Sequence, residues 1–266
     1  MASPLQHQPK SVILEHGYIN VYSELNPKEK RQLSYKRRYK KENPSWDETM
    51  VYLSHRFSEL CGNDAVVLDA GCGNGNYIID ENRGNIAWAV GVDVSADYTS
   101  KNICLDDIKT ADLGKLPFES DKFDMVTSLW VLEHLENPLR VFGEIHRVLK
   151  PGGVFMFATP NKSFLPLKIV HTIKLSRFNH LLNRTLFGRD KQDVFPAYYK
   201  ANTIKDIAGL SQGLFDIDEL KLNSDVSYTS FNEPSYLITK GLLKLPGGFS
   251  RLMQPHIIGV LRKRNA

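Results

Sequence analysis

Short apolar runs alternate with amphipathic segments through the middle of the chain. Each run has the length and the continuous hydrophobicity of a β-strand that is buried on both faces. Such strands, alternating with helices, predict a doubly wound, mostly parallel sheet covered by helices, which is an α/β fold. The predicted strands are residues 65–70, 88–94, 123–131 and 153–160, and a helix that Pro151-Gly152-Gly153 would stop is predicted over residues 138–150.

An amphipathic helix is also predicted before the first of these strands, over residues 45–62. Its apolar positions recur at helical spacing, and Gly62 suits its end. Ser45 and Glu48 have the spacing of a capping box, in which the hydroxyl and the carboxylate bond backbone amides reciprocally. The apolar positions are Met50, Leu53, Phe57 and Leu60.

After residue 161 the alternation breaks and then resumes. Residues 162–200 are rich in Lys, Arg and large apolar residues, and they form a basic amphipathic insertion. We expect this insertion to cover the substrate, and the alternative is a surface that rests on an anionic membrane. The chain is therefore divided into a helical cap or lid segment, 1–63, and one domain, 64–266, that contains the insertion. Within that domain, helices are predicted at 201–213 and 233–245 and strands at 214–222 and 256–264.

Composition narrows the class of protein only slightly. The chain has 266 residues and a net charge of +4, which is too weakly basic to argue for nucleic acid. The three cysteines form no CxxC pair, so neither a disulfide framework nor a cysteine-built zinc site is expected. The first ten residues contain no apolar core of signal-peptide length, and no apolar run is long enough to span a membrane. We expect a soluble, cytoplasmic protein.

Candidate chemistry begins in the stretch "VVLDAGCGNG", at the end of the first predicted strand. Glycines in such a turn let the backbone approach a ligand closely. Ligands of open α/β sheets bind beyond the carboxyl ends of the strands. Asp93 ends the next strand roughly 20 residues on, where an acid commonly accepts hydrogen bonds from ribose. A dinucleotide and a nucleoside both fit these features.

Two further acids favour the nucleoside. Asp69 precedes the glycines, where its charge would repel a pyrophosphate but attract a cationic group. Asp112 lies beyond another strand, where it could accept from an adenine amino group, while the amide of Leu113 could donate to a ring nitrogen. These residues predict a ligand that joins adenosine to a cationic moiety.

At this point a resemblance to a known family becomes apparent. "VVLDAGCGNGNY", "AVGVDVS", "ADLGKLPFESDKFDMV", "LWVLEHLENPLRVFGEIHRVLKPGG" and "FMFATPN" resemble, in order, the motifs of class I S-adenosylmethionine-dependent methyltransferases. The likeness is greatest to the small-molecule, type 11-like branch, and it covers roughly residues 66–161. It implies a seven-stranded Rossmann-like sheet whose last strand is antiparallel.

The resemblance also implies which residues bind the methyl donor, S-adenosyl-L-methionine, and that no metal is needed. The glycines would border its methionine part, Asp93 would hold the ribose, and Leu129 and Trp130 would line the sulfonium side. His134, which follows the fourth strand, is the candidate general base, with an unperturbed pKa of about 6.5; the alternative is that it only packs the loop. The implied donor-binding residues are Asp69, Gly71, Cys72, Gly73, Gly75, Asp93, Val94, Asp112, Leu113, Leu129 and Trp130.

The leading functional hypothesis is methylation of an oxygen, nitrogen or carbon atom of a small molecule, with natural-product or lipid-like metabolites as candidates. No nucleic-acid partner is expected, a peripheral membrane contact stays open, and the oligomeric state is not predicted. A second hypothesis is a catalytically silent protein that binds S-adenosylmethionine as a partner or regulator. A third, a nicotinamide oxidoreductase, is disfavoured by Asp69 and by Asn76, which stands where G-x-G-x-x-G needs its last glycine.

Overall fold

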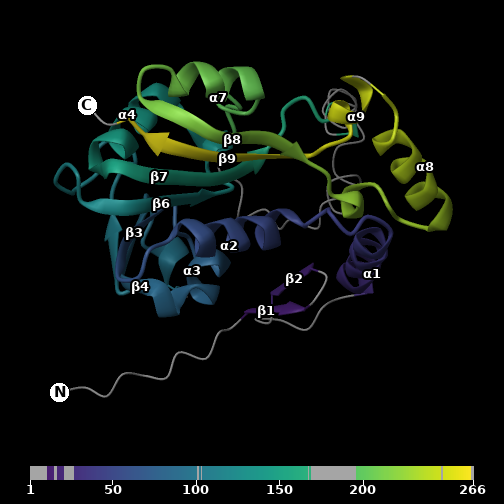
Figure 1. Cartoon of the computed structure of the whole chain (residues 1–266), viewed down its shortest axis with the longest axis horizontal. Helices are drawn as coiled ribbons and strands as arrows, with labels where there is room; N and C mark the ends of the chain where they lie inside the picture. Colours follow the sequence, from purple (N-terminus) through teal and green to yellow (C-terminus); the bar gives the residue numbers. More distant parts are fainter. Residues whose placement is uncertain are drawn as a thin grey trace.

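A seven-stranded sheet forms the centre of the molecule (Figure 1). In this computed structural model the described residues are 11–14, 17–20, 27–100, 102, 104–166, 168, 196–246 and 248–264. The strand order is β5-β4-β3-β6-β7-β9-β8, and β9 alone runs opposite to the other strands of this sheet. The predicted doubly wound fold with an antiparallel last strand is therefore confirmed. The strands are β3 (Ala65–Ala70), β4 (Ile86–Asp93), β5 (Asp107–Thr110), β6 (Phe123–Leu129), β7 (Leu149–Pro160), β8 (Phe215–Asn223) and β9 (His256–Lys263).

Alternate residues of the central strands enter two separate hydrophobic cores, which is why these strands read as continuous apolar runs. On one face, Leu68 and Val90 pack with helices α4 (Pro138–Val148) and α7 (Ile204–Ser211). On the other face, Val67 and Ala89 pack with α2 (Thr49–Leu60) and α3 (Tyr77–Glu81). The helices thus cover both faces of the sheet, and the carboxyl ends of the strands stay at one edge.

A third, smaller cluster joins the N-terminal part of the chain to the segment after β8. Helix α1 (Pro27–Glu42) packs on the 3-10 turn η5 (Val226–Tyr228) and on α8 (Glu233–Leu243). Tyr35 of α1 stacks on Tyr236 of α8 with ring centroids 5.1 Å apart. Because η5 follows directly after β8, which runs parallel to β7, α1 lies near the carboxyl ends of the parallel strands (Figure 1). The remaining elements are β1 (Ser11–Leu14), β2 (Gly17–Asn20), α9 (Gly248–Leu252) and the 3-10 turns η1 (Arg83–Asn85), η2 (Asp97–Thr99) and η3 (Leu132–His134).

The predicted capping box at the start of the second helix is wrong. The helix begins at Thr49, and Glu48 is its N-cap, with a side chain that accepts from the Met50 amide. The indole N–H of Trp46 donates to the carbonyl of Ser224 at 3.0 Å, so this segment is bonded to the residue that follows β8. That long-range bond fixes the residues around Ser45 in a non-helical path, and local spacing could not reveal it.

One strand was not predicted, and one predicted segment lies mostly outside the described residues. Strand β5 is a short edge strand with little burial, so it carries no apolar run by which to find it. Most of the predicted insertion lies outside the described residues, which include only 162–166, 168 and 196–200 of it. Within the described part of the chain, no helix has the length and apolar character needed to cross a bilayer.

Candidate functional site

The glycine turn after β3 is built on left-handed backbone. Gly71, Gly73 and Gly75 have φ values of +83°, +42° and +143°, which residues other than glycine rarely adopt. A Cβ added to Gly71 would lie 2.4 Å from a methyl carbon of Val131, so this glycine is also required by close packing. The amide of Gly71 donates to the carbonyl of Val92 at 2.8 Å. The turn therefore folds back over the end of the neighbouring strand.

Asp93 stands at the end of β4, against this turn. One carboxylate oxygen accepts from the Gly73 amide at 3.0 Å, and the other accepts from the Ser95 amide at 3.3 Å. A carboxylate has more acceptor capacity than these two bonds use. Val94, the next residue, is 59% exposed and leaves an apolar surface beside the acid.

Asp112 follows β5, the next strand of the sheet. The amide of Ala111 donates to the carbonyl of Asp93 at 3.0 Å, so the ends of β4 and β5 are joined. The carboxylate of Asp112 is exposed and accepts from the Gly114 amide at 2.7 Å, while Leu113 is buried. The acids predicted to hold ribose and adenine therefore lie at adjacent strand ends.

Asp69 is the buried acid of the group. One of its oxygens accepts from the amide of Asn76 at 2.8 Å and from the hydroxyl of Thr127 at 3.0 Å. The other oxygen is buried, and no hydrogen bond to it is found among the described residues. Burial raises the pKa of Asp69 to about 6, against the opposing effect of these two hydrogen bonds. A buried carboxylate with an unused oxygen favours a nearby cation, as a methionine ammonium would provide.

Cys72 contributes to the turn through its backbone. Its side chain packs against β4, because a Cβ added to Gly91 would lie 2.5 Å from its sulfur. Burial raises the pKa of the Cys72 thiol far above its usual range, so the thiol is a poor nucleophile.

The comparisons with known proteins agree with this geometry. Residues 68–157 match the type 11 family model described as a methyltransferase domain. The matched residues are those of a class I S-adenosylmethionine-dependent methyltransferase domain. One relative is a Mycolicibacterium smegmatis protein described as a probable S-adenosylmethionine-dependent methyltransferase, 32% identical over 49% of this chain and 54% of its own length.

A second relative is a ubiquinone biosynthesis O-methyltransferase from Glaesserella parasuis, 30% identical over 43% of this chain and 52% of its own. This chain thus spans about half the length of both relatives. Among solved structures, an S-adenosylmethionine-dependent methyltransferase from Mesorhizobium loti has the same fold. It has a TM-score of 0.50 and 18% identity, and the match covers 80% of this chain and 96% of that one.

Leu129 is the last residue of β6, and Trp130 follows it directly. Trp130 has a φ of +61°, a strained value for an aromatic residue. The conformation is held by its amide, which donates to the carbonyl of Ala158 at 2.9 Å, and by its ring, which packs edge-on to His256 with centroids 4.7 Å apart. Strain of this kind concentrates at functional sites.

His134 is the last residue of η3, four positions after Trp130. Its Nδ1 is 2.9 Å from the carbonyl oxygen of Pro196, and its Nε2 is 3.9 Å from a carboxylate oxygen of Glu133. A carbonyl can only accept, so Nδ1 carries the proton and a neutral ring leaves Nε2 as the basic atom. The contact also anchors the segment after residue 195, which is the structural role weighed as the alternative.

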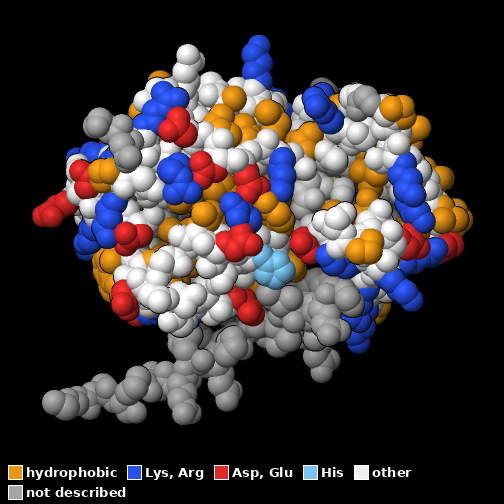
Figure 2. Space-filling view, in the orientation of Figure 1, with side chains coloured by type: hydrophobic (Ala, Val, Ile, Leu, Met, Phe, Trp, Pro, Cys, Tyr) orange, Lys and Arg blue, Asp and Glu red, His pale blue; other side chains and the backbone are white. Residues whose placement is uncertain are grey.

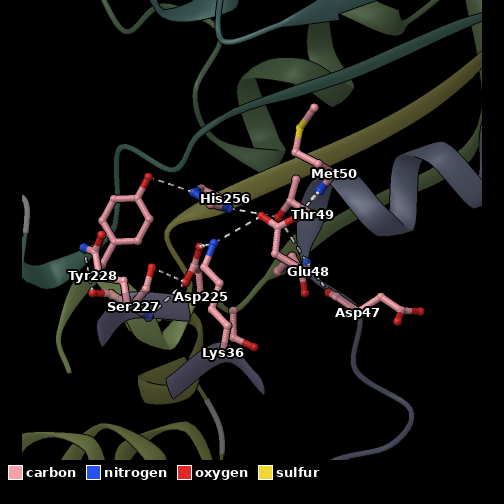
Figure 3. Close-up of polar contacts among 12 residues, drawn as sticks. Lys36, Asp47, Glu48, Thr49, Met50, Asp225, Ser227, Tyr228 and His256 are labelled. Atoms are coloured by element: carbon pink, nitrogen blue, oxygen red, sulfur yellow. Dashed lines mark hydrogen bonds and ion pairs between the residues drawn. The ribbon is translucent and has the colours of Figure 1, made fainter. Parts of the chain in front are cut away.

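A buried polar cluster next to Trp130 was not anticipated from the sequence (Figure 3). Lys36 lies 2.9 Å from Asp225 and 3.5 Å from Glu48. Burial lowers the pKa of Lys36, but the two carboxylates outweigh it and raise that pKa above its usual range. His256 contacts Thr49 and Tyr228 in the same region. The cluster joins α1, the start of α2, the turn after β8 and the first residue of β9.

No pattern in the sequence could have found this cluster. Lys36 lies in a basic run that reads as a solvated helix face, and His256 reads as the first residue of a strand. Asp225 lies more than 100 residues from Lys36 and Thr49 lies more than 100 residues from His256, so only the tertiary fold brings these pairs together. Among the described residues, no group of His, Cys, Asp and Glu is arranged to hold a metal ion.

Proposed function

We propose that this protein transfers the methyl group of S-adenosylmethionine to a small-molecule acceptor. The observation that carries the proposal is the set of acids Asp69, Asp93 and Asp112 at three neighbouring strand ends, around a glycine turn. The donor supplies an electrophilic sulfonium methyl, and the protein's task is to align the acceptor with it. Alignment of this kind can contribute roughly 7–11 kcal/mol to lowering a barrier.

In this proposal each acid has a separate task. Asp93 accepts from the ribose hydroxyls with the capacity that Gly73 and Ser95 leave unused. Asp112 accepts from the adenine amino group, and the Leu113 amide donates to the ring. Asp69 supplies the charge that favours the methionine ammonium. The glycine turn supports the role given to Asp69, since a backbone without side chains lets the methionine part of the donor come close to this acid.

The remaining predicted donor-binding residues line the same edge of the sheet. Val94 offers exposed apolar surface beside Asp93, and Cys72 contributes its backbone. Leu129 and Trp130 would border the sulfonium side, where the strained backbone of Trp130 places its ring against that of His256.

His134 is proposed as the general base where the acceptor is a hydroxyl. The bond to Pro196 supports this role, because it leaves Nε2 without a proton in the neutral ring. We expect His134→Gln to reduce turnover at least tenfold with affinity for S-adenosylhomocysteine unchanged, and His146→Gln on α4 serves as the control. Unchanged turnover would assign His134 the anchoring role alone.

The acceptor is proposed to be a small metabolite rather than a nucleic acid. The weak net charge of +4 supports this choice, as does the description of one relative as a ubiquinone biosynthesis O-methyltransferase. On the face drawn in Figure 2, basic and acidic side chains lie interspersed over the coloured surface. The proposal includes a cytoplasmic location, supported by three buried free cysteines. Whether the basic insertion touches a membrane is answered by co-sedimentation with anionic vesicles at low salt.

Calorimetric titration with S-adenosylhomocysteine and with NAD tests the donor site. We expect binding of the former and none of NAD, and the reverse would refute the proposal. Incubation with methyl-labelled donor and a metabolite extract, followed by mass spectrometry, then tests turnover. Donor binding without any labelled product would favour the alternative of a catalytically silent binding protein.

A further inference from the structure

Helix α8 is apolar on its outer face as well as on its inner one. The inner face packs in the small cluster with α1, where Tyr236 and Thr239 are buried. On the opposite side Leu237 and Ile238 are exposed, and so is Leu245 just beyond the end of the helix. The outward face of a surface helix ordinarily carries polar and charged residues. The outer face of α8 instead leaves apolar surface in contact with solvent.

The exposed apolar residues are concentrated in this part of the chain. Ten large apolar side chains are exposed among the described residues, and five of these ten lie within residues 231–249. Single exposed apolar side chains are ordinary, whereas a group of them marks a surface that binds a partner or a membrane. We call the five residues the α8 patch, which also includes part of α9, the helix that packs on α8. They are Phe231, Leu237, Ile238, Leu245 and Phe249.

The α8 patch lies in a strongly basic part of the molecule. Helix α1, which packs against α8, contains eight Lys and Arg residues and only two Glu residues. Residues 231–253 add one acid, Glu233, and three basic residues, Lys240, Lys244 and Arg251. Together these two segments have a net charge of +8, although the whole chain has only +4, so the rest of the chain has −4. On the face drawn in Figure 2, hydrophobic side chains gather at the right, over α8, with basic ones beside them.

Charge decides between two kinds of partner for the α8 patch. A second copy of the chain would bring the same basic surface to a symmetric contact, and the like charges would oppose it. A membrane with anionic lipids offers the opposite charge together with an apolar layer, and Lys and Arg beside an apolar helix face are typical of interfacial helices. Lys240 pairs with Glu42, but no ion pair of Lys244 or Arg251 is found in the described part of the chain. These two cations are therefore available to lipid headgroups.

We propose that the α8 patch docks on the surface of an anionic membrane. Leu237 and Ile238 enter the layer of lipid headgroups, and Lys244 and Arg251 bind lipid phosphates. This binding goes beyond the proposed methyl transfer and does not depend on it. It is also separate from the basic insertion, because no residue of the α8 patch lies within 162–200. Since α8 packs on α1 near the carboxyl ends of the parallel strands, docking would hold that edge of the sheet toward the lipid (Figure 1).

The test is co-sedimentation of the full chain with vesicles of phosphatidylglycerol and phosphatidylcholine in equal parts. We expect the protein to bind these vesicles at low salt and to bind pure phosphatidylcholine vesicles roughly tenfold more weakly. Leu237→Gln combined with Ile238→Gln should weaken binding to the anionic vesicles roughly tenfold, because two apolar side chains are withdrawn from the lipid. Leu139→Gln on α4 is the matched control and should have no effect, since Leu139 and Ile238 are both 63% exposed.

The charge of the surface is tested by a second pair of variants. Lys244→Glu should weaken binding to the anionic vesicles roughly fivefold or more. Lys205→Glu, an exposed change on α7, is its control and should have little effect. Added salt should weaken the binding of the unmodified protein, because exposed charges are screened. An unchanged midpoint of urea unfolding shows that each variant folds, whether or not the protein binds S-adenosylhomocysteine.

Three results would overturn the proposal. The first is that the unmodified protein does not bind the anionic vesicles. The second is equal binding by the unmodified protein and by the variant with Leu237→Gln and Ile238→Gln, which would move the membrane contact to another surface, such as the insertion. The third is a dimer in solution, measured by light scattering, that dissociates in this variant, which would assign the α8 patch to a second copy of the chain.

Discussion

Asp69 shows at the scale of one residue how function and stability oppose each other. Its pKa is about 6 in the folded protein, because burial stabilises the neutral carboxyl relative to the ionised one. The stability that this neutral form contributes is present below about pH 4 and is lost as the pH rises through about 6, by about 3 kcal/mol in all. A cationic ligand would offset that loss, because it favours the ionised form.

Replacement of Asp69 should therefore separate the two effects. We expect Asp69→Asn to weaken S-adenosylhomocysteine binding roughly tenfold at pH 7.5, because the charge that attracts the ammonium is lost. In the unmodified protein the affinity should rise between pH 5 and 7, as Asp69 ionises, and in the variant it should not. Calorimetry at several pH values measures both. Asp64→Asn, an exposed change at the other end of β3, is the control, and a pH dependence retained in Asp69→Asn would contradict the assignment.

Gly71 is limited by space as well as by conformation. A Cβ there would meet Val131 at 2.4 Å, and the φ of +83° is strained for alanine. We expect Gly71→Ala to lower the free energy of unfolding by about 1–3 kcal/mol and to weaken donor binding. Gly84→Ala, where no atom lies within 4 Å of the added Cβ, should change neither quantity by much. Urea unfolding and calorimetry compare the pair, and equal behaviour of the two variants would show that the turn tolerates a side chain.

At the scale of elements, one buried lysine joins α1 to the rest of the molecule. Lys36 is the counter-ion of Asp225, whose side chain is 3% exposed. Burial raises the pKa of Asp225, but the charges of Lys36 and His256 and the hydrogen bonds from Ser227 and Lys36 together outweigh burial and lower that pKa below its usual range. The pair therefore contributes stability above about pH 4, and this contribution is lost as the pH falls below the unfolded-state pKa toward that of the folded state.

Removal of this lysine should be costly. Lys36→Met leaves Asp225 as a buried charge without its counter-ion, for which we expect a loss of about 3–5 kcal/mol in the free energy of unfolding. Lys41→Met, an exposed change on the same helix, should cost less than about 0.5 kcal/mol. Urea unfolding at pH 7 measures both changes. Similar midpoints for the two variants would show that α1 is held by its aromatic contacts alone.

The whole molecule should respond to its donor as a single folding unit, because α1, the sheet and the segment after β8 share contacts around the site. S-adenosylhomocysteine at 100 times its dissociation constant should stabilise the protein by about 2.7 kcal/mol. For a chain of this size that corresponds to a rise of roughly 5–10 °C in the unfolding temperature. NAD at the same concentration should produce no shift. Differential scanning fluorimetry measures both, and a shift with NAD alone would contradict the predicted donor site.

The sequence by itself determined the sheet and the place of the acids proposed to bind the donor, because both depend on local patterns. Continuous apolar runs identify strands buried on two faces, and the acids that follow them must meet at one edge of a parallel sheet. Asp69 and Asp93 could therefore be placed at this edge without coordinates, and the structure shows that Asp112 follows the neighbouring strand β5. The edge strand β5 escaped notice because a half-exposed strand of four residues has no apolar run.

Only the tertiary structure decided what lies opposite the proposed donor site. The start of α2 moved from Ser45 to Thr49 because Trp46 bonds to Ser224. Likewise, Lys36 meets Asp225, and His256 stands between Trp130 and Tyr228. Such contacts join residues far apart in the chain. Their contribution to the free energy of folding depends on how deeply the groups are buried and how they are oriented, and the periodicity of a sequence contains neither.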